Sequence, residues 1–137
     1  KAHLFLQLYL VDAKITGNCT LCAVPTSGGG FSCMEEIIKI IANENRIDGS
    51  NALRRKYAIE KLSQGGSRDI DVHLNSIYCF DRNNVFGKFV VLLDDVATTG
   101  NSMLACQQIL LEAGALAVFP LCLGFTVKEP FTAYALC

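Results

Sequence analysis

The sequence has few charged residues, almost no net charge and no long apolar run. Charged side chains make up 18% of the 137 residues, and 12 basic against 13 acidic residues leave a net charge of −1. Without an overall basic field, general electrostatic binding to nucleic acid is not expected. No stretch approaches the ~18 consecutive apolar residues that a membrane-spanning helix requires. There is also no internal repeat, linker or low-complexity tract.

What the sequence does have is a large apolar fraction, 51% of its residues. That fraction is enough to build a hydrophobic core, and it argues against disorder. The length is typical of one compact domain, since two cores of ordinary size need more chain. We therefore expect a single domain over residues 1–137.

Cysteine is unusually frequent, with seven residues. They are Cys19, Cys22, Cys33, Cys79, Cys106, Cys122 and Cys137. The number is odd and several of them lie inside apolar runs, where cysteine packs as a small hydrophobic residue. We expect reduced thiols and a cytoplasmic protein rather than a disulfide framework. Cys19 and Cys22 form one isolated CxxC motif, so a zinc or redox site there is the less favoured alternative.

The first half of the sequence alternates strand and helix signals. Residues 2–11 are apolar with leucines in alternation, which favours a buried strand over a signal peptide. Residues 20–25 form a second short strand, followed by a glycine-rich loop at 26–30. Ser32 and Glu35 then have the spacing of a capping box, which predicts a helix beginning there and ending before Gly49.

The second half continues the pattern after a polar stretch at 51–72, which we interpret as a mostly mobile excursion. A short strand at 76–80 and a turn precede a buried strand at 89–93. A helix at about 102–113 and a strand at 115–123 follow.

Pro120 lies inside that last predicted strand, which indicates an edge position or a bulge. Strands that alternate with helices in this way predict an α/β fold with an open, mainly parallel sheet and flanking helices. In such sheets the ligand crevice lies beyond the carboxyl ends of the strands.

Residues 90–102 place unusual chemistry at one such end. The strand ends on Asp94 and Asp95, whose carboxylates cannot be buried without partners. The following loop, 96–100, can turn backbone N–H groups toward an anion, and the helix that begins near Ser102 adds its positive end. Carboxylates for sugar hydroxyls beside a phosphate cradle describe a ribose 5-phosphate site.

This stretch resembles the phosphoribosyl pyrophosphate (PRPP) motif of type I phosphoribosyltransferases, and the layout is most similar to the ComF-like branch. The resemblance covers about residues 20–125 and is specific near 90–114. It implies that Asp94 and Asp95 contact the ribose 2- and 3-hydroxyls. It assigns the 5-phosphate to Val96, Ala97, Thr98, Thr99, Gly100 and Ser102.

Two further segments fit the same resemblance. It assigns pyrophosphate to the glycine-rich loop, at Thr26, Ser27, Gly28 and Gly29. The basic segment 54–68 resembles the loop that closes over the diphosphate and neutralises the leaving group. Its candidates are Arg54, Arg55, Lys61 and Arg68, with Arg68 as the catalytic candidate. His73 is expected to be a surface or capping residue rather than a general base.

The implied activity is that of a pentosyltransferase of nucleotide metabolism. It would bind PRPP with Mg²⁺, transfer the phosphoribosyl group to a nitrogenous base or amine and release pyrophosphate. Mg²⁺ would be held through PRPP, with Asp94 and Asp95 as the candidate protein ligands. The hood that selects the acceptor would be reduced, because only residues 124–137 follow the last strand. Apolar chain ends favour a homodimer.

Two alternatives remain open at this point. A regulatory or DNA-uptake accessory domain of the same fold could bind PRPP or a nucleotide without catalysis. A receiver domain with Asp95 as phosphoacceptor is disfavoured, because the two acids are adjacent and late in the chain.

Overall fold

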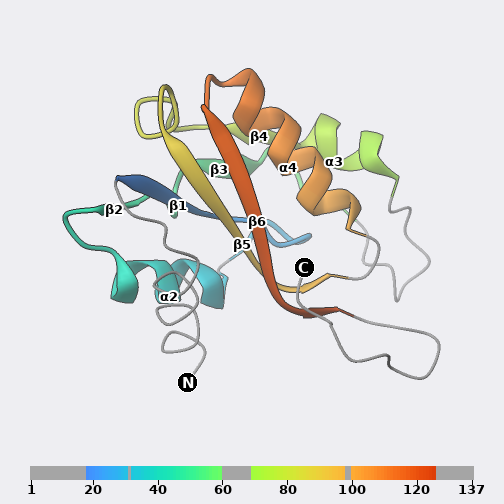
Figure 1. Cartoon of the computed structure of the whole chain (residues 1–137). Coiled ribbons are helices and arrows are strands. Elements are labelled where there is room, and N and C mark those ends of the chain that lie inside the picture. The colour runs from blue at the N-terminus through green and yellow to red at the C-terminus, as the bar shows by residue number, and fades with distance from the viewer. Residues whose placement is uncertain (1–17, 31, 60–68, 98–99, 126–137) are drawn as a thin grey trace.

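The computed structural model describes residues 18–30, 32–59, 69–97 and 100–125. A four-stranded, fully parallel sheet forms its centre (Figure 1). The strand order is β2-β1-β5-β6. The strands are β1 (Cys19–Ala23), β2 (Arg46–Asp48), β5 (Phe89–Ala97) and β6 (Ala117–Phe125). The α/β class and the parallel sheet are as the sequence predicts.

Helices cover both faces of this sheet (Figure 1). They are α2 (Cys33–Ile41) and α4 (Asn101–Glu112), while α3 (Ile70–Ser76) packs against α4 and β4. Side chains of α2 pack against one face of β1 and β5, where Leu21 and Leu93 are fully buried. Side chains of α4 pack against the other face, where Leu92 is fully buried. Successive strand residues thus contribute to two separate cores, as the period of two in a strand requires.

The predicted start of the first helix is confirmed by local geometry, and the helix ends at Ile41, well before Gly49. Ser32 is the N-cap of α2, and its Oγ accepts a hydrogen bond from the Met34 N–H at 3.1 Å. At the start of α4, Gly100 has a φ of 79°, which glycine adopts without strain. Pro120 lies in β6, which is an edge strand of the sheet among the described residues, in agreement with the predicted edge position or bulge.

The interpretation of residues 51–72 as a mobile excursion is wrong at both ends of that segment. Strand β3 (Leu53–Arg55) pairs antiparallel with β4 (Ile77–Cys79) in a second, two-stranded sheet. Helix α3 begins at Ile70. Two of the three residues of β3 are arginines, so the sequence shows no hydrophobic alternation there. The strand is identified by its pairing with β4, which is distant in sequence.

Strand β5 is longer than predicted and includes Val96 and Ala97, for which the sequence predicts a loop. These two residues pair with Gly124 and Phe125 of β6. Because β6 has nine residues, it supplies a partner for β5 after β1 has ended at Ala23. Any phosphate loop that follows β5 therefore begins later than the sequence suggested.

The cysteines divide into two groups. Cys19, Cys22, Cys33, Cys79 and Cys106 carry free thiols, in agreement with the expectation of reduced cysteines. Cys122 is disulfide-bonded, so that expectation is wrong for Cys122. Cys19 and Cys22 belong to cores on opposite faces of the sheet, so this CxxC motif cannot chelate one metal ion.

Several predictions fall outside the described residues. They are the strand at 2–11, the hood, and the candidates Lys61, Arg68, Thr98 and Thr99. Within the described part of the chain, no helix is long and apolar enough to cross a membrane.

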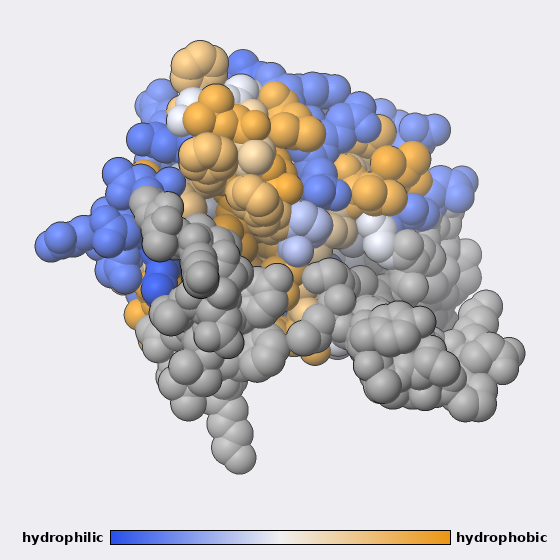
Figure 2. Space-filling view, viewed as in Figure 1, coloured by the Kyte–Doolittle hydropathy of each residue, from blue (hydrophilic) through white to orange (hydrophobic). Residues whose placement is uncertain are grey.

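Apolar side chains are exposed at the amino-terminal ends of β5 and β6. Phe86, Phe89, Leu116 and Phe119 are each about half exposed or more, at 72%, 47%, 63% and 47%. Figure 2 shows apolar residues gathered over this part of the molecule. We refer to these four side chains as the apolar end; it lies opposite the carboxyl edge of the sheet.

Candidate functional site

The carboxyl end of β1 lies beside the point in β5 where the acidic pair begins. The Val24 N–H donates to the Leu93 carbonyl oxygen at 2.9 Å, so the two strands are still paired where β1 ends. The next residues are Pro25, which begins the glycine-rich loop, and Asp94, which begins the acidic pair. The fold therefore brings together two segments that are about seventy residues apart in the sequence.

The two acids have different environments. Asp94 is half-buried and Asp95 is exposed. The Asp94 Oδ1 accepts a hydrogen bond from the Asp95 N–H at 2.9 Å. The pKa of the Asp94 carboxyl is raised to about 7, chiefly by burial and also by a hydrogen bond to the neighbouring Asp95 side chain and its charge. A carboxyl with this pKa changes its charge near neutral pH.

The glycine-rich loop makes a tight turn between β1 and α2. Gly29 has a φ of 72°, and its N–H donates to the Thr26 carbonyl oxygen at 3.1 Å. The Thr26 hydroxyl donates to the Gly30 carbonyl oxygen at 3.1 Å and closes the turn. Thr26 and Ser27 are half-buried, whereas Gly28 and Gly29 are exposed. Backbone amides of an exposed loop of this kind are accessible to an anion.

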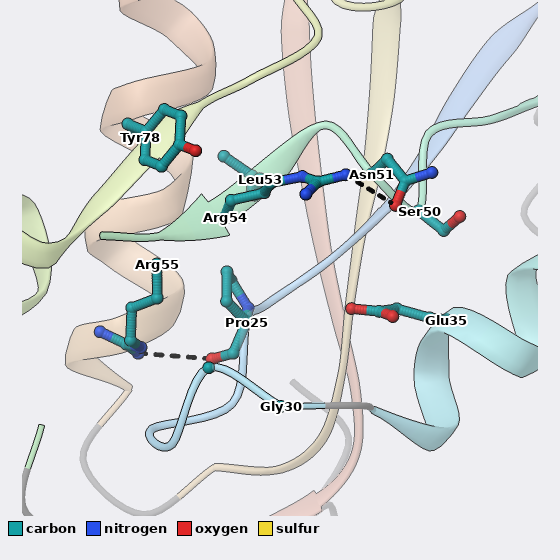
Figure 3. A pocket seen from close by; sticks show the side chains of 10 residues that line it. Pro25, Gly30, Glu35, Ser50, Asn51, Leu53, Arg54, Arg55 and Tyr78 are labelled. Atoms are coloured by element: carbon teal, nitrogen blue, oxygen red, sulfur yellow. Dashed lines mark hydrogen bonds between the residues drawn. The ribbon is translucent and has the colours of Figure 1, made fainter. Parts of the chain in front are cut away.

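Arg55 joins this loop to the helix on the other side. Its Nε donates to the Thr26 carbonyl oxygen at 2.8 Å, and its Nη2 donates to that of Pro25 at 3.3 Å (Figure 3). Its Nη1 donates to the Ser76 Oγ at 2.5 Å. Its Nη2 also lies 3.4 Å from the His73 Nδ1. The guanidinium thus reaches one loop and one helix at the same time.

His73 is buried, with 1% of its surface exposed, so the expectation of a surface or capping residue is wrong. It belongs to α3 rather than to the turn before a strand. Arginine can only donate, so the Nδ1 accepts from Arg55 and the ring proton of the neutral tautomer lies on Nε2. A burial this complete is stable because the polar ring has a partner.

A polar pocket of about 380 Å³ lies between the glycine-rich loop and β3 (Figure 3). It is lined by Pro25, Gly29, Gly30, Glu35, Ser50, Asn51, Leu53, Arg54, Arg55 and Tyr78. Arg54 is exposed; its guanidinium carbon lies 4.1 Å from the centre of the Phe80 ring, and its Nη2 donates to the Asn51 Oδ1 at 3.4 Å. The acidic pair does not line this pocket.

The structure therefore brings some predicted site residues together and separates others. Asp94, Asp95 and the glycine-rich loop lie at one edge of the sheet, and Gly100 and Ser102 begin α4 after β5. Arg55 contacts the loop itself, and Arg54 lines the pocket. Sequence reasoning missed Glu35, Ser50, Asn51 and Tyr78 as lining residues. The only signal for Ser50 and Asn51 is that they follow β2, a three-residue strand that was not predicted.

The acidic pair suits a magnesium ion only in part. Carboxylate oxygens are the ligands that Mg²⁺ prefers, and one or two of them with substrate phosphates can hold it. Among the described residues, no group of three or more His, Cys, Asp or Glu side chains could hold a metal ion. A magnesium ion at Asp94 and Asp95 would therefore need further ligands from a bound phosphate compound.

The chain was also compared with known proteins. No protein-family model matches it, and no curated protein matches its sequence.

Proposed function

We propose that this chain is a phosphoribosyltransferase of type I that binds PRPP with Mg²⁺. One observation carries the proposal: the Val24–Leu93 hydrogen bond sets the glycine-rich loop beside the acidic pair, at the carboxyl edge of a parallel sheet. Ligands of open α/β sheets bind at this edge. The motif at 90–102 and the loop at 26–30 are the two segments that the family resemblance assigns to PRPP.

Each segment offers a different part of PRPP its matching chemistry. The Asp94 and Asp95 carboxylates accept hydrogen bonds from the ribose 2- and 3-hydroxyls. The start of α4 after Gly100 offers backbone N–H groups and a positive helix end to the 5-phosphate. The amides of Thr26, Ser27 and Gly28 offer donors to the pyrophosphate.

The reaction would displace pyrophosphate from ribose C1 by a nitrogen nucleophile. It needs no covalent nucleophile from the protein. In the transition state positive charge develops at C1 and negative charge develops on pyrophosphate, and catalysis consists of stabilising both. Asp94 and Asp95 would orient the ribose, and the amides of the glycine-rich loop would hold the leaving group. When bound, Mg²⁺ would neutralise charge on the diphosphate. Arg54 lines the pocket and is exposed, so its positive charge is accessible to a ligand bound there.

One observation favours the non-catalytic alternative, a PRPP- or nucleotide-binding regulatory domain. Arg55, which we expected to neutralise the leaving group, instead donates hydrogen bonds to the protein. A domain that binds PRPP without transfer needs less positive charge at the pyrophosphate. Release of pyrophosphate in the presence of purine, pyrimidine and small amine acceptors separates the enzyme from the regulatory domain.

Calorimetric titration of PRPP with Mg²⁺ tests the binding site itself. We expect micromolar affinity for the wild type and loss of binding in the double variant Asp94→Asn/Asp95→Asn. Glu44→Gln is the matched control, because this exposed carboxylate lies in the turn before β2, away from the site. Circular dichroism checks that each variant is folded. A folded wild type that fails to bind PRPP would refute the proposal.

A further inference from the structure

Three consecutive carbonyl groups of the glycine-rich loop are held from the same short segment. Arg55 donates to the carbonyl oxygens of Pro25 and Thr26, at 3.3 and 2.8 Å. The backbone N–H of Ile59 donates to the carbonyl oxygen of Ser27 at 2.8 Å. The segment 55–59 therefore fixes the orientation of three successive peptide planes.

Each peptide plane carries one C=O group and one N–H group, so fixing the three carbonyls also fixes the directions of three amides. In a trans peptide the C=O and N–H groups point in opposite directions, and no peptide bond among the described residues is cis. The planes that carry the carbonyls of Pro25, Thr26 and Ser27 also carry the N–H groups of the residues that follow. The N–H groups of Thr26, Ser27 and Gly28 therefore point away from the segment that holds the carbonyls. Successive amides turned to one side form a concave site for an anion.

Arg55 is itself fixed at its far end. Its Nη1 donates to the Ser76 Oγ and its Nη2 to the His73 Nδ1, and both partners are buried residues of α3. The Ser76 hydroxyl in turn donates to the His73 carbonyl oxygen at 3.4 Å. A guanidinium is a planar group with donors in fixed directions, so these contacts set its plane. The orientation of the loop is thus coupled to α3 rather than to β1 alone.

We infer that Arg55 is a positioning residue that orients the amides of Thr26, Ser27 and Gly28 toward a diphosphate. The identity of that ligand rests on the proposed function, whereas the hold on the loop does not. Arg55 acts through the loop and does not contact the ligand, because its donors are used on protein acceptors at both ends. The role differs from charge neutralisation, since the arginine controls where other donors point.

The neighbouring Arg54 provides a matched control. It carries the same charge, but it is exposed and its partners are the Phe80 ring and Asn51. Arg55→Met removes the hydrogen bonds to the loop and keeps much of the side-chain volume. Arg54→Met removes the same charge without touching a loop carbonyl. Arg55→Lys restores the charge but lacks the planar set of donors.

The first measurement needs no ligand. Amide resonances and hydrogen exchange of Thr26, Ser27 and Gly28 are followed by NMR in the free protein. Arg55→Met and Arg55→Lys should shift these resonances and speed their exchange, while those of β5 stay unchanged. Arg54→Met should leave the loop as in the wild type. A loop that is unaltered in Arg55→Met would overturn the role of Arg55, whatever the protein binds.

The second measurement titrates inorganic pyrophosphate and, separately, ribose 5-phosphate, both with Mg²⁺. Arg55→Met should weaken pyrophosphate binding by about tenfold or more, the effect of losing at least one amide–anion hydrogen bond. Ribose 5-phosphate affinity should be unchanged, because that ligand is assigned to the end of β5. General destabilisation would instead weaken both ligands, and this result would overturn the inference.

Two further outcomes are distinguishable. A direct contact between Arg55 and pyrophosphate would make the affinity less sensitive to salt in Arg55→Met, and this change would overturn the positioning role. Failure of the wild type to bind either pyrophosphate or PRPP would refute the proposed function and the ligand assigned to the loop. The NMR measurement would still decide whether Arg55 orients the loop.

Discussion

Replacing Asp94 by asparagine should remove a pH-dependent loss of stability. The Asp94 carboxyl has a pKa of about 7 in the folded protein against an ordinary value of 3.8, chiefly because it is buried. Between these two values the folded state binds more protons than the unfolded state. The free energy of unfolding therefore falls as pH rises through this window, which is the direction opposite to that of a salt-bridged carboxylate.

The magnitude follows from the shift. A difference of about three pKa units, at about 1.36 kcal/mol each, gives a loss of about 4 kcal/mol between pH 4 and pH 8. In the middle of the window the slope is about −1.4 kcal/mol per pH unit. Asparagine is close in shape to aspartate and has no charge to desolvate, so Asp94→Asn should lack this component.

Urea unfolding followed by far-ultraviolet circular dichroism, at half-unit steps from pH 4 to pH 8, measures the effect. The quantity of interest is the difference in unfolding free energy between Asp94→Asn and the wild type, because other titrating groups cancel in it. This difference should grow in favour of the variant as pH rises. Glu44→Gln, at an exposed carboxylate, should give a flat difference. Parallel curves for Asp94→Asn and the wild type would refute the assignment of a desolvated carboxyl to this position.

Replacing each of two glycines by alanine should distinguish a tightly packed position, Gly49, from an open loop position, Gly30. At Gly49 an added Cβ would lie 2.7 Å from the Leu21 carbonyl oxygen, so Gly49→Ala should cost about 2 kcal/mol or more in urea unfolding. At Gly30 nothing lies within 4 Å, and Gly30→Ala should change stability by less than about 0.5 kcal/mol; equal effects would contradict the packing. Loss of the N-cap hydroxyl in Ser32→Ala should cost about 1 kcal/mol by the same assay, and Ser32→Asp should largely retain the stability.

The fold could be predicted where the signal is local. The apolar run at 89–93 predicts a buried strand because a strand covered on both faces needs apolar residues at every position, and it became most of β5. Ser32 marked a helix start through side-chain capping, which acts over a few residues. Strand β3 could not be found in this way, because its hydrogen-bond partner is β4, more than twenty residues away.

The site shows the same division. The acidic pair and the glycine-rich loop were identifiable because each directly follows an apolar run typical of a buried strand, although β5 itself continues past the two acids to Ala97. The hydrogen bonds from Arg55 to the loop could not be predicted from the sequence. Their acceptors are main-chain carbonyls 29 and 30 positions earlier, and every residue has such a carbonyl. His73 was misjudged for the same reason, because the partner that permits its burial is 18 positions away.

Pro120 has a consequence for how the molecule meets its neighbours. An exposed edge strand is a template on which another chain can add a strand, since its N–H and C=O groups are unpaired. In the described part of the chain β6 is such an edge, but proline interrupts its row of donors near the middle. A second copy therefore cannot continue the sheet along an unbroken ladder. Association would instead use side chains, and the apolar end at Phe86, Phe89, Leu116 and Phe119 is a surface that could be buried in this way.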